Sequence, residues 1–102
     1  MRYQVQLGVP RAGGMLAWRA AAGDFGRRLA CRESSAVIAP RVDREIRRGR
    51  DFVRVVIVMT VDAGDVAGAL TLAWRVFTIA AGVDAAGWDM AAASAEVRPE
   101  RR

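Results

Sequence analysis

Residues 36–47 have the sequence AVIAPRVDREIR, and the fold of the chain depends on whether they form a helix or a strand. Ile38, Val42 and Ile46 recur every four residues, which suits a helix but also a strand, because four is an even step. Pro40 lies between them and would break a helix, whereas an edge strand accepts a proline. We therefore expect an edge strand here.

The segment after this strand and its Arg48-Gly49 turn is strongly apolar. Residues 52–61 have the sequence FVRVVIVMTV, which is rich in branched side chains and typical of a central strand. Alternation gives such a strand two faces. We expect its odd-numbered residues to face helices and its even-numbered residues to lie on an open face beside Gln4 and Gln6.

The rest of the chain shows four further elements. The patterns predict a strand over residues 3–9, a helix from Met15 to near Cys31, a helix over residues 65–81 and a last strand over residues 89–97. Pro10 is expected to end the first strand, and Asp62 and Asp65 are expected to cap the second helix.

The order of these elements predicts an α+β fold of the ferredoxin-like, split βαβ kind. In that βαββαβ arrangement two helices cover one face of a four-stranded antiparallel sheet. The first and third strands are then central, and the second and fourth are edges. We expect one domain over residues 1–98 and a frayed basic tail over residues 99–102.

Charge favours anionic partners over cationic ones. The 102 residues include 16 basic residues, all of them arginine, against 11 acidic ones, which gives a net charge of +5. The absence of lysine and asparagine, together with abundant alanine, indicates that part of this arginine excess reflects a GC-rich genome.

The residue types exclude most catalytic chemistry. The chain has no histidine and no lysine, so no imidazole or tuned amine can activate Cys31, Ser34 or Ser35 as a nucleophile. A single cysteine also leaves no disulfide and no conventional zinc site. We expect no enzyme activity, no metal and no cofactor, with an enzyme that uses carboxylates alone as the alternative.

The glycine spacing of residues 8–15 resembles a phosphate-binding P-loop, but two residues that the motif needs are different. Gly14 replaces the lysine that reaches the phosphates, and Met15 replaces the hydroxyl that holds magnesium. We therefore interpret the segment as an ordinary glycine-rich turn.

Two features bear on the location of the protein. Glutamines alternate with apolar residues at positions 4 and 6, which does not suit a secretory signal. The apolar run over residues 55–59 is far shorter than the ~20 residues that cross a bilayer. We expect a soluble, cytoplasmic protein without a membrane partner.

Arginines concentrate in residues 41–54, which carry a net charge of +3, whereas residues 55–95 carry −3. A guanidinium group donates two parallel hydrogen bonds and keeps its charge, so an arginine-rich hairpin suits a phosphate backbone. Alternatively, the acids and arginines form cross-strand pairs that protect an edge strand from aggregation. The candidate nucleic-acid-binding residues are Arg41, Arg44, Arg47, Arg48, Arg50, Phe52 and Arg54.

Residues 48–55, RGRDFVRV, resemble the longer ribonucleoprotein signature of RNA-recognition motifs. The resemblance implies that Phe52 stacks on a base and that Arg48 contacts a phosphate. The segment departs from the signature at Arg50, Asp51 and Val55. The aromatic residue of the first strand, Tyr3, is expected on the helix-covered face, where it cannot stack on a base.

A second stretch, residues 87–99 (GWDMAAASAEVRP), resembles short uncharacterised proteins of actinobacteria and their phages. This resemblance implies a bacterial or phage origin and no particular activity.

Two functions follow as hypotheses. In the first, the chain is a small non-enzymatic module that holds nucleic acid non-specifically through its arginine-rich hairpin. In the second, the chain binds a second copy of itself or another protein. The partner would then be bound by the open sheet face and by the helix over residues 65–81. The apolar arc of this helix is wider than is needed to pack against one sheet.

Overall fold

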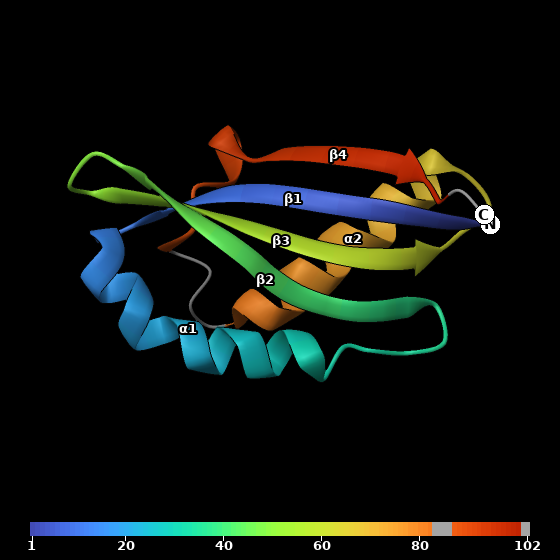
Figure 1. Cartoon of the computed structure of the whole chain (residues 1–102), viewed down its shortest axis with the longest axis horizontal. Helices are drawn as coiled ribbons and strands as arrows, with labels where there is room; N and C mark the ends of the chain where they lie inside the picture. The colour runs from blue at the N-terminus through green and yellow to red at the C-terminus, as the bar shows by residue number, and fades with distance from the viewer. Residues whose placement is uncertain (83–86, 101–102) are drawn as a thin grey trace.

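The computed structural model describes residues 1–82 and 87–100, and this part of the chain is α+β, with two helices and a four-stranded antiparallel sheet (Figure 1). The elements are β1 (Arg2–Ala12), α1 (Gly14–Ala30), β2 (Val37–Arg48), β3 (Phe52–Asp62), α2 (Val66–Ala81), the 3-10 helix η2 (Met90–Ala92) and β4 (Ser94–Pro99). The stretch that decides the fold, predicted as a strand over residues 36–47, is a strand from Val37 to Arg48.

The strands lie in the order β2-β3-β1-β4, and every neighbouring pair is antiparallel. The two central strands are therefore β1 and β3, and β2 and β4 are the edges, as the sequence predicts. The start of β1 and the end of β4 lie together at one end of the sheet, where the Glu100 N–H donates to the Arg2 carbonyl at 2.9 Å.

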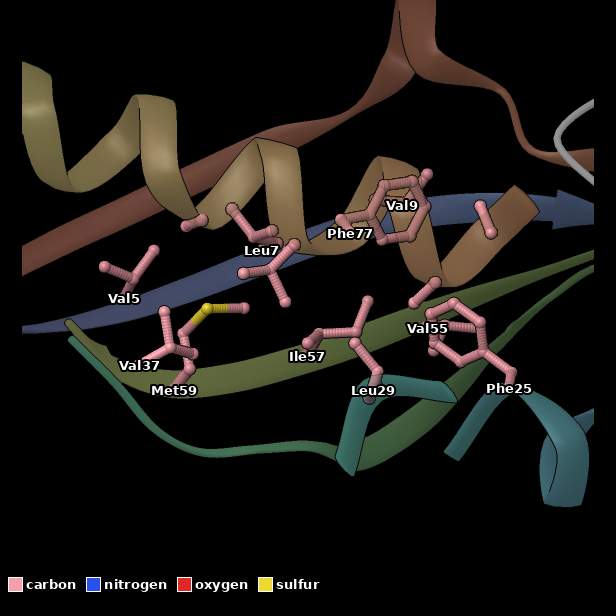
Figure 2. Packing of buried hydrophobic residues seen from close by; sticks show 14 of the residues in the cluster. Val5, Leu7, Val9, Phe25, Leu29, Val37, Val55, Ile57, Met59 and Phe77 are labelled. Atoms are coloured by element: carbon pink, nitrogen blue, oxygen red, sulfur yellow. The ribbon is translucent and has the colours of Figure 1, made fainter. Parts of the chain in front are cut away.

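One face of the sheet carries the core. The odd-numbered residues of β1 and β3 face each other in register, and the pair Leu7 and Ile57 at their centre is fully buried. Phe25 of α1 and Phe77 of α2 pack on this same face, with ring centroids 5.8 Å apart (Figure 2). Both helices therefore cover one side of the sheet, and the other side is left open.

The residues at the start of each helix explain where it begins: two glycines at the start of α1 and an aspartate just before α2. The N–H of Gly13 donates to the Asp51 carbonyl at 2.9 Å, and Gly13 and Gly14 both have positive φ, so the chain turns sharply from β1 into α1. The carboxylate of Asp65 accepts the N–H of Gly68 at 2.7 Å and caps α2. The cap by Asp65 was predicted, but Asp62, which was also expected to cap α2, instead pairs with the N-terminal ammonium group.

The first strand does not end at Pro10, as the sequence suggested, but continues to Ala12. Pairing with β4 stops at Gly8, which lies opposite Ser94. The Pro10 carbonyl accepts the Asp89 N–H at 2.8 Å on that same side of β1. The nitrogen of a strand residue points to the same side as its carbonyl, so the missing N–H of Pro10 costs no ladder bond.

The last strand also begins later than predicted. Residues 89–97 were expected to be extended, but the chain first forms η2, with the Ala92 N–H donating to the Asp89 carbonyl at 3.3 Å. The reason lies just before this segment, where buried Trp88 packs against Phe25 and Phe77 and draws the chain toward the core. Strand β4 then includes Pro99; residues 101–102 of the expected tail lie outside the described part.

Candidate nucleic-acid interface

Two irregularities interrupt the alternation of side chains along β2. Ala39 has φ 51°, and the register shifts between Ile38 and Arg41, so that both of these residues lie on the open face. A second shift falls between Val42 and Arg44. Because of this second shift Arg41 and Arg44, three positions apart, also share the open face of the sheet.

Rows of paired residues cross this open face, and successive rows lie about 7 Å apart along the central strands. Each row is given in the order β2, β3, β1, β4, starting at the end of the sheet where β1 begins. The first three rows are Ile38, Thr60, Gln4 and Arg98; Arg41, Val58, Gln6 and Glu96; and Arg44, Val56, Gly8 and Ser94. The last two rows, nearest the β2–β3 hairpin, do not include β4 and are Ile46, Arg54 and Pro10; and Arg48, Phe52 and Ala12. Five of the seven candidate residues therefore belong to one surface.

The hairpin end of the open face combines arginine with an aromatic ring. Arg48 lies directly opposite Phe52, whose side chain is 41% exposed. Both residues line a shallow hollow of about 300 Å³ together with Arg54. Tyr3, by contrast, is buried on the helix side, as predicted. Phe52 and two guanidinium groups thus meet at one place, where a base could stack between charges that attract phosphate.

Arg54 reaches across two strands. Its guanidinium lies over Gly8 of β1, where a Cβ would overlap it, and its Nη2 donates to the Ser94 hydroxyl of β4. The absence of a side chain at position 8 therefore allows Arg54 to lie flat on the sheet. This contact holds one positive charge at the centre of the open face.

The opposite end of the open face is a polar hollow of about 200 Å³. Its floor includes the side chains of Gln4 and Gln6 from β1 and Thr60 from β3. Arg41 from one edge strand and Arg98 from the other flank it. We refer to this site as the polar hollow. The sequence pattern placed the two glutamines on the open face but gave no sign of the arginine of β4.

The ion pairs of the open face are exposed. Arg44 and Asp43 approach to 2.5 Å, and Arg98 and Glu96 to 3.5 Å, with at least 41% of each side chain accessible to solvent. Exposed pairs of this kind contribute about 0–1 kcal/mol. These arginines can therefore exchange their carboxylate partners for phosphate at little cost.

The other two candidate residues lie elsewhere. Arg47 is opposite Val53, a core residue, so its side chain leaves the sheet on the helix side. Arg50 shares a hollow with Arg47 and with Leu16 at the start of α1. The arginine-rich hairpin is therefore divided between two faces, and only one of them contains Phe52.

The arginines of the open face come from all four strands. Six arginines lie on it, against two carboxylates of paired strand residues and a third, Asp43, that forms an ion pair with Arg44. The excess is therefore three positive charges. These residues are Arg2, Arg41, Arg44, Arg48, Arg54 and Arg98 against Asp43, Asp62 and Glu96. Alternation in β1 could have revealed Arg2, whereas Arg98 lies beyond the predicted last strand.

The described residues contain no cluster of three or more carboxylate or thiol side chains placed to hold a metal ion. Cys31 lies exposed after the last turn of α1. Neither α1 nor α2 is long and apolar enough to span a bilayer.

Comparison with family models, curated proteins and solved structures finds no match to this chain. Inference about its function therefore starts from the open face itself.

Proposed function

We propose that this chain is a small binding module without catalysis, and that its open sheet face holds nucleic acid through the phosphates. The observation that carries the proposal is the excess of three positive charges on that face. Guanidinium groups at successive rows can contact successive phosphates of one strand, and such contacts supply most non-specific affinity. Phe52 adds a ring on which a base can stack.

We also propose that the fold is the ferredoxin-like, split βαβ arrangement. The strand order, with β1 and β3 inside and β2 and β4 outside, supports this assignment. So does the packing of α1 and α2 on a single face. The resemblance of residues 48–55 to RNA-recognition motifs agrees with this proposal, because that segment lies on the hairpin and the start of β3.

Self-association is the second candidate, and charge separates its two possible surfaces. Two open faces would bring like charges together, which opposes a dimer through the sheet. On α2, however, the apolar side chain of Ile79 is 49% exposed. A second copy could bind around this residue. Sedimentation analysis of the concentrated protein tests this candidate, and a strict monomer contradicts it.

Two neighbouring arginines provide a matched test of the open face. Arg48 lies on it and Arg47 lies on the helix side, and both side chains are exposed. We expect Arg48→Ala to weaken binding of a fluorescent single-stranded oligonucleotide several-fold at low salt, with Arg47→Ala close to wild type. Fluorescence anisotropy measures both. Equal losses would assign binding to the hairpin as a whole, and no binding by the wild type would exclude the proposal.

A further inference from the structure

The polar hollow differs chemically from the rest of the open face. Its floor is neutral, because Gln4, Gln6 and Thr60 carry amide and hydroxyl groups in place of charges. Within residues 1–82 and 87–100, neither glutamine side chain forms a hydrogen bond to another protein group. The two amides are therefore available to a ligand.

The donor and acceptor pattern of these amides indicates what kind of group suits them. A carboxamide both donates and accepts, whereas phosphate oxygens only accept. The edge of a nucleobase presents both kinds of atom, and adenine in particular pairs two atoms with one glutamine amide. The hollow thus fits a base better than a phosphate.

Size and surroundings agree with this assignment. Sites for drug-sized ligands occupy about 300–1,000 Å³, so a hollow of about 200 Å³ suits a single planar ring system. Arg41 and Arg98 enter from opposite edge strands and can hold the phosphates on either side of that ring. Glu96 adds a carboxylate that accepts a hydrogen bond from an exocyclic amino group.

We propose that the polar hollow is a base-recognition subsite for single-stranded nucleic acid. Gln4 and Gln6 bind the edge of one unpaired base, with adenine preferred over thymine or uracil because only adenine offers an amino group to Glu96. A base inside a duplex cannot reach the floor of the hollow, since its neighbours in the stack hold it in place. This inference rests on the proposed function and adds sequence preference to it.

The composition of the chain gives this proposal a direct spectroscopic test. Gln4 and Gln6 are the only residues with a carboxamide side chain, because the sequence contains no other glutamine and no asparagine. All carboxamide NH2 signals in a ¹⁵N correlation spectrum, which are separate in ¹⁵N frequency from those of the arginine guanidinium groups, therefore come from the polar hollow. We expect both pairs of signals to shift when the protein is titrated with a short oligothymidine that carries one central adenine.

Affinity measurements with two oligonucleotides complete the test. The wild type should bind the adenine-containing oligothymidine about fivefold or more tightly than plain oligothymidine. The double variant Gln4→Ala, Gln6→Ala should lose this preference and keep its affinity for plain oligothymidine. Arg48→Ala is the matched control, because it should weaken both affinities and leave their ratio unchanged. Circular dichroism checks that each variant is folded.

The outcomes separate this inference from the proposed function. Equal binding of the two oligonucleotides by the wild type, or glutamine signals that do not move in the bound state, would overturn the subsite and leave phosphate binding in place. Failure to bind either oligonucleotide would overturn both. A lost preference in the double variant with normal affinity for oligothymidine supports the subsite.

Discussion

A side chain at position 8 would collide with the guanidinium of Arg54, which crosses β1 to donate to Ser94. Gly8→Ala should displace Arg54 without unfolding the chain, because the overlap involves the flexible end of a long side chain. The lost hydrogen bond, about 0.5–1.5 kcal/mol, is offset by the smaller entropy cost of alanine in a strand, about 0.5–1 kcal/mol.

Urea denaturation measures this balance, and we expect the free energy of unfolding to change by less than about 1 kcal/mol. Ser94→Ala is the control, since it removes the same hydrogen bond and leaves Gly8 in place. A much larger loss in Gly8→Ala alone would mean that the backbone, and not Arg54, opposes the new methyl group.

Two glycines of α1 should respond in opposite directions to the same substitution. Gly14 has φ 71°, and its Cβ would lie 2.5 Å from the backbone carbonyl oxygen of Arg50, which cannot move aside. We expect Gly14→Ala to lower the free energy of unfolding by about 2 kcal/mol or more. Gly26 is helical and its Cβ would meet nothing, so Gly26→Ala should raise it by about 0.5–1 kcal/mol. Thermal melts of the two variants test the pair.

At the scale of elements, the start of α2 depends on one carboxylate. Asp65 accepts the Gly68 N–H, so Asp65→Ala should cost about 0.5–2 kcal/mol of stability. Asp62 is the matched control, because its carboxylate forms an exposed ion pair with the N-terminal ammonium group at 3.2 Å and does not cap α2. Denaturation curves of the two variants should differ, and similar losses would contradict the role of Asp65 as the cap.

Strand β2 shows how far sequence patterns predict the candidate site. The proline correctly indicated an edge strand, and alternation correctly placed Phe52 and Arg54 on the open face. Alternation could not place Arg41 and Arg44 on one face, because they are three positions apart. The register shift between Val42 and Arg44 puts them there, and such a shift depends on how β2 pairs with β3.

At the scale of the whole molecule, the open face should make binding sensitive to salt. If four to six arginines neutralise phosphates of a single strand, the logarithm of the affinity should fall with the logarithm of salt concentration with a slope of about −3 to −4. Titrations at several ionic strengths measure this slope. An affinity that does not change with salt concentration would mean that phosphates are not bound by the open face. It would favour the alternative function, association of two copies through α2.

Local patterns were sufficient for the outline of the protein. The order of elements, the cap of α2, the central position of β3 and the division of that strand into core and open faces all follow from side-chain spacing and from the backbone preferences of proline and glycine. These properties depend on neighbours within a few residues, so a single sequence contains them.

The assembly of the open face depends on contacts between distant segments. Arg98 of β4 reaches the glutamines of β1 only through the pairing of the two strands, and Arg54 reaches Ser94 only because Gly8 lies between them. Pro10 remains in β1 because the pairing of β1 with β4 stops at Gly8 and does not need an N–H from Pro10. Register is set by which pairing buries the apolar faces best, and that choice is made by the whole core at once. The tertiary structure therefore decided which arginines of the edge strands share a surface with Arg54.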